Sequence, residues 1–280
     1  MFTHLIIFTL IQSGVQDQKV QFERLAAKVL QQGEFQERVI ETARLFLGAP
    51  YQARTLEQEG EERLVVNLDA FDCTTLMDNV LAMSRAVQQT PVTYERFCRE
   101  LASVRYRDAV VNGYASRLHY FCDWVWDASR RGLITDLTKE LGGKVNPKVV
   151  SFMTQNPQYY PSLSDPVTYA AIKAAEDRLN ATTRYRIEEA DIASSEAGIR
   201  DGDIIALTFS KPGLVIAHVG FAVRVHGRVH LLHASSDLKK VVVSDQTVED
   251  MIRSSNRFDG MMVMRPIAPQ SDIHNPSQGG

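Results

Sequence analysis

The sequence has few cysteines, almost no excess charge and no long apolar run. Its three cysteines cannot all pair within one chain of 280 residues, so at least one thiol stays unpaired. A net charge of −3 argues against a basic surface that follows phosphates, so we expect no nucleic-acid partner. No apolar run approaches the roughly 20 residues that span a bilayer, which predicts no transmembrane anchor. No Cys-x-x-Cys pair occurs, and we predict neither a metal site nor a cofactor. Nothing in the sequence indicates an oligomeric state.

The amino terminus has one short apolar segment, residues 5–11. This segment is typical of the core of a secretory signal, but no basic residue precedes it and no A-x-A-like cleavage site follows. Residues 1–18 are therefore predicted to be a signal peptide or a disordered N-terminus, with a short buried strand or helix end as the alternative. Export, to a periplasm for instance, is the expected localisation, and the cytoplasm is the alternative.

The rest of the chain changes its hydrophobic period about two thirds of the way along. The composition is ordinary for a globular protein, with 44% apolar and 23% charged residues. Helical spacing comes first and strand patterns joined by short turns follow, which predicts an α+β fold with an antiparallel β-meander. We expect one catalytic domain over 19–269, a helical insertion at about 91–180, and a disordered tail at 270–280. The predicted helices are 35–47, 91–104, 116–131, 165–179 and 247–252, and the predicted strands are 203–209, 214–225, 229–234, 239–243 and 260–265.

One of the three cysteines stands where a helix should begin. Asp72 is a predicted N-cap, and Cys73 is then a first-turn residue of a helix that continues through Leu76 and Val80. The positive end of a helix dipole stabilises a thiolate, so we expect a lowered thiol pKa, and free N–H groups of the same turn could hold an oxyanion. A buried structural cysteine is the alternative. Cys98 and Cys122 fit as small apolar fillers of helix faces.

Two histidines in the predicted sheet supply a base and a partner. In Val215–Val225 the odd positions are apolar, which places His218 and Gly220 on the other face of the strand. If His226-Gly227 is a two-residue hairpin turn, Gly220 lies opposite His233, and His218 and His233 become diagonal neighbours. Two ordinary hairpin histidines are the alternative. Together with Cys73, these residues predict a catalytic triad in which Cys73 attacks, His218 transfers the proton, and His233 orients His218.

Five short motifs occur in an order that resembles the NlpC/P60 superfamily of papain-like cell-wall hydrolases. They are 47–51 (LGAPY), 71–76 (FDCTTL), 202–205 (GDII), 218–221 (HVGF) and 232–235 (LHAS). The resemblance implies a papain-like fold, Cys73 as nucleophile, His218 as base, His233 as third member, and Tyr51 near the thiol. The sequence departs from the common pattern after Tyr51, where 52–57 (QARTLE) replaces the usual glycines.

The helical insertion is similar to that of the DUF1460 branch, described as N-acetylmuramoyl-L-alanine amidase-like. The resemblance covers residues 35–267 and implies hydrolysis of the amide between N-acetylmuramic acid and L-alanine in peptidoglycan or muropeptides. A γ-D-glutamyl-diamino acid endopeptidase of the same fold and a non-catalytic wall-binding module are the alternatives.

The insertion is rich in Arg, Tyr and His. Aromatic faces pack on sugar rings, and Arg105, Arg107 or Arg117 could pair with stem-peptide carboxylates. For any single residue, helix core or a solvated surface is the alternative. The predicted substrate-binding residues are Tyr51, Asp72, Arg105, Tyr114, Arg117, His119 and Ser235.

Overall fold

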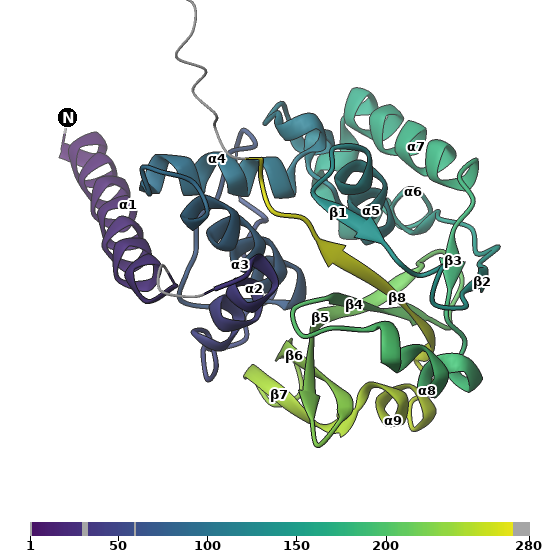
Figure 1. Cartoon of the computed structure of the whole chain (residues 1–280). Coiled ribbons are helices and arrows are strands. Elements are labelled where there is room, and N and C mark those ends of the chain that lie inside the picture. The colour runs from purple at the N-terminus through teal and green to yellow at the C-terminus, as the bar shows by residue number, and fades with distance from the viewer. Residues whose placement is uncertain (1, 30–32, 59, 271–280) are drawn as a thin grey trace, which may run out of the picture.

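A computed structural model describes residues 2–29, 33–58 and 60–270. Figure 1 shows a sheet with helices on both sides, which confirms an α+β fold. The helices are α1 Phe2–Val29, α2 Phe35–Arg44, α3 Cys73–Val87, α4 Tyr94–Arg105, α5 Phe121–Arg130, α6 Phe152–Gln155, α7 Pro166–Asn180, α8 Ile192–Ser195 and α9 Val248–Arg253. The strands are β1 Ile134–Asp136, β2 Lys144–Val145, β3 Tyr185–Arg186, β4 Ile204–Phe209, β5 Ile216–Val225, β6 Arg228–Ser235, β7 Lys240–Thr247 and β8 Phe258–Pro266.

The main sheet has the strand order β1-β8-β4-β5-β6-β7, and its neighbouring strands are all antiparallel. The predicted meander is therefore right for β4 to β7 only, because β8 returns to pair with the free edge of β4. The edge strand β1 comes from within the insertion and was not predicted. Its three residues carry too little alternation to be recognised from the sequence.

Both faces of the sheet are buried. In β4, Ile204 and Ala206 pack with the helices that include α3, while Ile205 and Leu207 pack with Ile252 of α9 and other residues on the opposite side. A strand buried on both faces is apolar at every position, which explains the continuous apolar run 204–207. The sheet is thus the middle layer of three, and the N-terminus of α3 lies against it (Figure 1).

The helix boundaries follow their capping residues. Thr93 caps α4, which begins at Tyr94 and not at 91 as predicted, and Asp165 caps α7, with its side chain accepting from Thr168 N–H at 2.9 Å. The predicted helix 116–131 was wrong at its start. Tyr114–Ser116 forms a separate 3-10 turn, and α5 begins only at Phe121.

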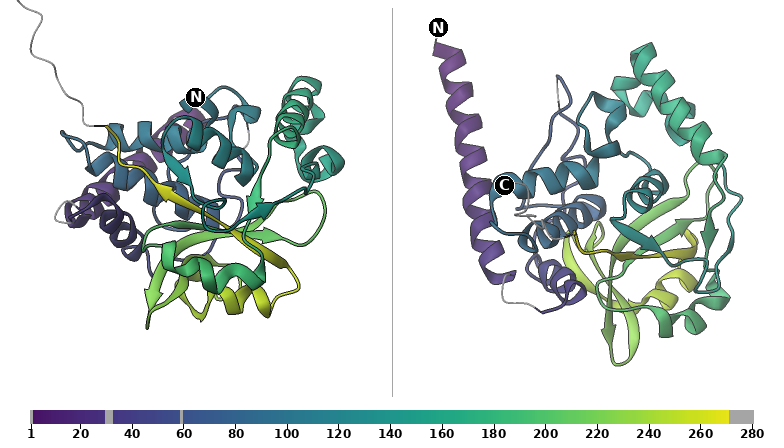
Figure 2. Two further views of the ribbon diagram at one scale, coloured as in Figure 1. Left: turned by 45° about the vertical axis from the view of Figure 1, so that its right-hand side comes forward. Right: turned by 45° about the horizontal axis from the view of Figure 1, so that its top comes forward.

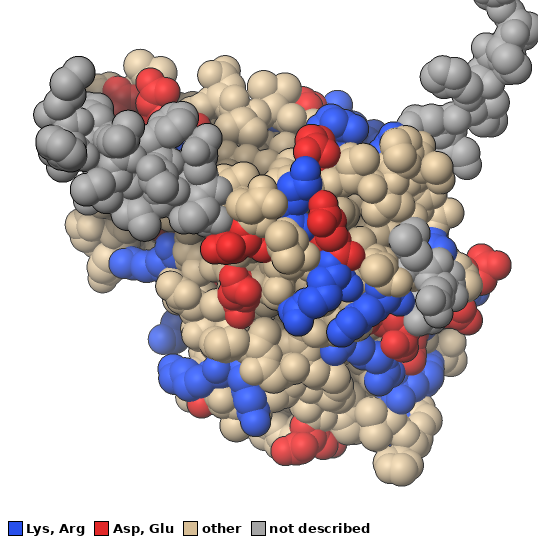
Figure 3. Space-filling model, turned by 90° about the vertical axis from the view of Figure 1, so that its left-hand side faces the viewer, with Lys and Arg blue, Asp and Glu red and all other residues tan. Residues whose placement is uncertain are grey.

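Helix α1 occupies the region predicted as a signal peptide or disordered N-terminus. Its N-terminal half extends beyond the body of the molecule (Figure 2). The signal peptide stays a prediction, and the predicted tail lies outside the described residues from 271 onward. Among the helices that the structure describes, none combines the length and the apolar character needed to span a membrane. On the face shown in Figure 3, basic and acidic side chains are intermixed.

Candidate active site

Helix α3 begins with a capping box that fixes the position of Cys73. Thr75 N–H donates to Asp72 Oδ1 at 2.8 Å, and Asp72 N–H donates to Thr75 Oγ1 at 2.9 Å. Cys73 is the first residue of the helix, so its own N–H belongs to the first-turn groups that no helical carbonyl can satisfy. The sequence prediction for Asp72 as N-cap is confirmed, and the turn presents a thiol together with free backbone donors.

Cys73 is part-buried, and its thiol lies between this turn and the sheet. Its neighbours include the backbone N–H of Val219 in β5 and the hydroxyl of Thr74. Burial, with a smaller contribution from the Asp72 carboxylate, raises the pKa of Cys73 to about 11. The expected lowering of this pKa was wrong, because removal of the sulfur from water outweighs the donors at the helix N-terminus. The resting group is a protonated thiol.

The hairpin of β5 and β6 has the predicted register. Val225 pairs with Arg228 and Phe221 with Leu232, and both residues of the two-residue turn, His226 and Gly227, have a positive φ. A Cβ built on Gly220 would lie 2.9 Å from His233 Cβ, so only glycine leaves His233 its place.

His218 and His233 form a hydrogen-bonded pair, as the register required. His218 Nε2 lies 2.6 Å from His233 Nδ1, and the two rings stand nearly perpendicular, at 89°. Burial, with the neighbouring His233 and Arg257 contributing less, lowers the pKa of His218 to about 3. Burial also lowers the pKa of His233 to about 4. Both imidazoles are therefore neutral at neutral pH.

Cys73 and His218 line the same cavity, and the residue after His218 contacts the sulfur through its N–H. No hydrogen bond joins the thiol to either histidine among the residues described. Because His233 occupies Nε2 of His218, the Nδ1 atom is the ring nitrogen left for proton transfer. Their roles in a reaction stay predictions.

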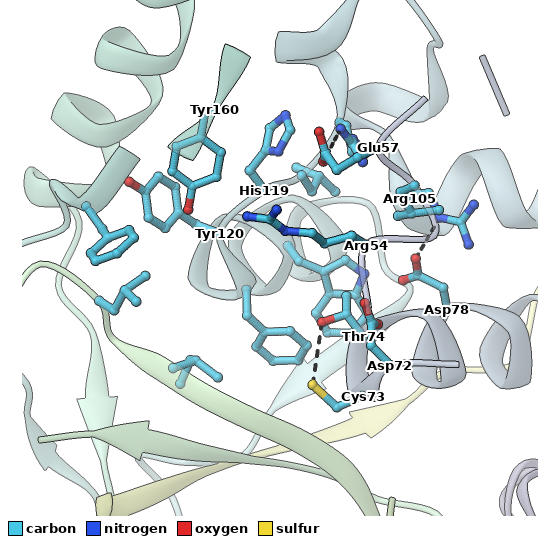
Figure 4. A pocket seen from close by; sticks show the side chains of 18 of the residues that line it. Arg54, Glu57, Asp72, Cys73, Thr74, Asp78, Arg105, His119, Tyr120 and Tyr160 are labelled. Carbon is cyan, nitrogen blue, oxygen red and sulfur yellow. Dashed lines mark hydrogen bonds and ion pairs between the residues drawn. The ribbon is translucent and has the colours of Figure 1, made fainter. Parts of the chain in front are cut away.

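The cavity has a volume of about 1090 Å³ and runs from the start of α3 into the helical insertion. It is larger than the usual pocket for a single small ligand, which measures roughly 300–1,000 Å³. Figure 4 shows Cys73 and Thr74 at one end and Tyr120 and Tyr160 at the other. The charged residues that line it are Arg54, Arg105 and Arg117 together with Glu57, Asp72 and Asp78.

One carboxylate holds together the aromatic wall of the cavity. Glu176 of α7 is 1% exposed and accepts from Tyr120 Oη at 2.6 Å and from Thr154 N–H at 3.1 Å. The Tyr120 hydroxyl in turn accepts from Met153 N–H at 2.7 Å. These bonds tie α5, α6 and α7 into one unit beside the catalytic candidates.

Two of the predicted substrate-binding arginines already have partners in the chain. Arg105 is buried and bonds Asp78 Oδ2 through Nε at 2.8 Å. Arg117 pairs with Glu57 at 2.9 Å and with Glu62 at 3.4 Å. Breaking the Arg105 pair to reach a ligand would leave the buried carboxylate of Asp78 uncompensated, whereas Glu57 is exposed. Carboxylate binding by these two arginines stays a prediction, and both are held at the cavity lining by ion pairs within the chain.

Arg107, the third arginine considered from the sequence, is held in the same way. Its guanidinium forms two bonds to Asp123, at 2.9 and 2.6 Å. It does not line the cavity.

The other predicted binding residues divide into two groups. His119 lines the cavity, with its ring 4.2 Å from the ring of Tyr114, and burial lowers its pKa to about 3. Tyr114, Tyr51 and Ser235 lie behind the lining. Ser235 Oγ accepts from Leu238 N–H at 3.1 Å, which is a turn-forming role. Burial raises the pKa of Tyr51, and its proximity to Cys73 and the Asp72 carboxylate raises it further.

Arg54, Glu57, Asp78 and Tyr160 line the cavity and were not predicted. Arg54 lies in the segment that the sequence analysis noted only for its missing glycines. Asp78 lies one helical turn after Thr74 on the same face of α3. Helical spacing could therefore have indicated that its side chain lies near the cavity. Tyr160 lies in a Pro-rich stretch with no periodic signal.

Among the described residues, no group of three or more His, Cys, Asp or Glu side chains is arranged to hold a metal ion. Arg105 and Arg117 of the cavity lining form ion pairs with carboxylates of the chain.

Comparison with known proteins points to one family. The model of the AmiA-like family, described as N-acetylmuramoyl-L-alanine amidase-like, matches residues 41–261. A crystal structure named N-acetylmuramoyl-L-alanine amidase from Bacteroides uniformis is 36% identical, with a TM-score of 0.80 over 84% of this chain and 100% of that one. No curated protein matches the chain.

Two further solved structures are similar. One is described as a putative xylanase from Bacteroides fragilis, with 35% identity and a TM-score of 0.75 over 81% of this chain and 99% of that one. The other, a Legionella pneumophila protein assigned to DUF1460, is 19% identical with a TM-score of 0.68 over 93% and 98%, and shares the fold. On the family match and the 36% identity, the chain belongs to the AmiA-like, N-acetylmuramoyl-L-alanine amidase-like family.

Proposed function

We propose that this protein is a cysteine amidase with a papain-like NlpC/P60 fold. Its substrate would be a peptidoglycan fragment, cleaved between the lactyl group of N-acetylmuramic acid and L-alanine. The observation that carries the proposal is the burial of the Cys73 sulfur against β5, next to the strand residue His218 that is bonded to His233. The family name and the name of the Bacteroides uniformis relative support the scissile bond.

The proposed reaction uses the neutral forms of both groups. His218 takes the thiol proton as the sulfur attacks the lactyl carbonyl carbon, and the oxyanion faces the N–H groups of the first turn of α3. His218 then gives the proton to the leaving amine of L-alanine, and a thioester forms on Cys73. Water attacks this thioester with His218 as base, which releases the muramic acid carboxylate and restores the thiol.

Mass spectrometry of the products tests the scissile bond. The purified protein is incubated with a defined GlcNAc-MurNAc-peptide. The expected products are the intact stem peptide beginning at L-alanine and the disaccharide with a free lactyl carboxylate. A shortened stem still attached to the sugar would replace this proposal with an endopeptidase of the same fold. No product at all would indicate a wall-binding module.

The pKa values predict an unusually flat pH profile. His218 is a neutral base above its pKa of about 3, and Cys73 keeps its proton below its pKa of about 11. Because the active combination persists between these values, kcat/KM should show no inflection between about pH 5 and 9. Steady-state hydrolysis of a soluble muropeptide across this range is the measurement. An acid limb with a midpoint at about 6.5, the ordinary histidine value, would contradict it.

A further inference from the structure

Arg54 is the cavity arginine that the chain leaves without an ion pair among its described residues. Arg105 and Arg117, the other two arginines of the lining, are bound to Asp78 and to Glu57 and Glu62. Arg54 lines the same cavity but has no hydrogen bond or ion pair to a described side chain, and Figure 4 shows its guanidinium end directed into the pocket. A cation placed in this way has its donors available for a ligand.

The backbone at Arg54 has a conformation that arginine rarely adopts. Its φ is 62°, in the left-handed region that favours glycine. Residues held in this region cost free energy, and such residues cluster where a side chain must be aimed at a ligand. The positive φ and the lack of an ion pair with any described side chain are independent observations, and both concern Arg54.

The surroundings of Arg54 suit an anionic group. Tyr160 lies near enough for the charge of Arg54 to act on its hydroxyl, which burial and Glu57 keep protonated at neutral pH by raising its pKa. A protonated phenol donates a hydrogen bond, and a guanidinium donates two in parallel to a carboxylate. Glu57, a carboxylate of the same lining, is bound to Arg117.

We propose that Arg54 binds a free carboxylate of the stem peptide and makes the protein select muropeptides that carry one. The proposal rests on the proposed function for the identity of the ligand. It assigns to Arg54 the recognition that the sequence had suggested for Arg105, Arg107 and Arg117. Substrates in which the stem carboxylates are amidated would lose this contact.

Two substrates that differ only in charge test the assignment. MurNAc-L-Ala-D-Glu has free carboxylates, and its diamide has carboxamides in their place. For Arg54→Gln we expect KM for the acid to rise about 10- to 100-fold with kcat little changed, because a charged hydrogen bond is worth roughly 1.5–3 kcal/mol. KM for the diamide should stay the same. Arg54→Lys should recover part of the affinity for the acid, since lysine keeps the positive charge but cannot donate two parallel hydrogen bonds to a carboxylate.

Arg63→Gln is the matched control. Arg63 is exposed, lies in the neighbouring segment and does not line the cavity, so the same loss of charge there should leave both KM values unchanged. If Arg54→Gln raised KM equally for both substrates, or for neither, carboxylate recognition by Arg54 would be refuted.

A binding measurement separates this proposal from the proposed function. In a Cys73→Ala background, calorimetry with the acid and the diamide reports affinity without turnover. Loss of acid binding in Cys73→Ala/Arg54→Gln, with diamide binding unchanged, supports the role of Arg54 even if the products of the active protein show another scissile bond. Equal binding of both ligands to the two variants overturns it.

Discussion

Replacement of Cys73 with alanine should lower kcat/KM for a MurNAc-peptide by at least about four orders of magnitude. Removal of a nucleophile leaves only binding and oxyanion stabilisation, and these alone retain little of the rate. The fold should remain, because Asp72 and Thr75 make the capping box without the sulfur. Product formation followed by mass spectrometry, with a thermal melt of the same sample, measures both quantities.

Cys98→Ala is the control for this substitution. Cys98 lies on α4, part-buried and packed against the main core, and does not line the cavity. Its replacement should leave kcat/KM within a factor of about two, as expected for a residue remote from the reaction. Turnover that survives in Cys73→Ala would refute covalent catalysis by this thiol.

His218→Ala should cost about 10³- to 10⁴-fold in kcat, the upper range for a residue that serves as both general base and general acid. The thiol is protonated at rest, so without the imidazole the proposed acceptor of its proton is missing. The effect should fall on kcat rather than on KM, since the proton transfer belongs to the transition state. Steady-state kinetics at pH 7 give the separation.

His230→Ala controls for damage to the hairpin. His230 lies on β6 and its Nδ1 is 2.8 Å from Ser244 O, so it contributes to the sheet and not to the cavity. We expect near-normal kcat for this variant. A His218→Ala protein that kept a tenth or more of its activity would show that another group transfers the proton.

Local sequence rules were sufficient for the catalytic candidates. A capping residue before an apolar helix placed Cys73, and a two-residue turn with glycine set the register that brought His218 to His233. Each of these depends on residues close together in the chain. The pairing of His218 with His233 could therefore be calculated by counting along one hairpin.

The charged lining could not be predicted in this way. Arg105 meets Asp78 across 27 residues, and Arg117 meets Glu57 across 60. Which arginine has a carboxylate partner depends on how the helices pack, and the sequence offered Arg105, Arg107 and Arg117 as equal candidates without Arg54. Arg54, which has no ion pair among the described residues, is distinguished by what Arg105 and Arg117 bind.

The prediction of a lowered pKa for the Cys73 thiol was wrong for a related reason. The helix N-terminus is a local feature and lowers the pKa, whereas burial against β5 is a tertiary one and raises it to about 11. A rule based on position in a helix carries no information about how much water the fold leaves at that position.

The bonds from Glu176 to Tyr120 and Thr154 give the molecule two parts that can change separately. The thiol and the histidines stand on α3 and the central hairpin, while the wall that faces them has its own hydrogen-bonded support at Glu176. Substitutions in that assembly can reshape what the cavity accepts without moving a reacting atom. Such a division allows related chains to acquire new substrates by altering the insertion while inheriting the same chemistry unchanged.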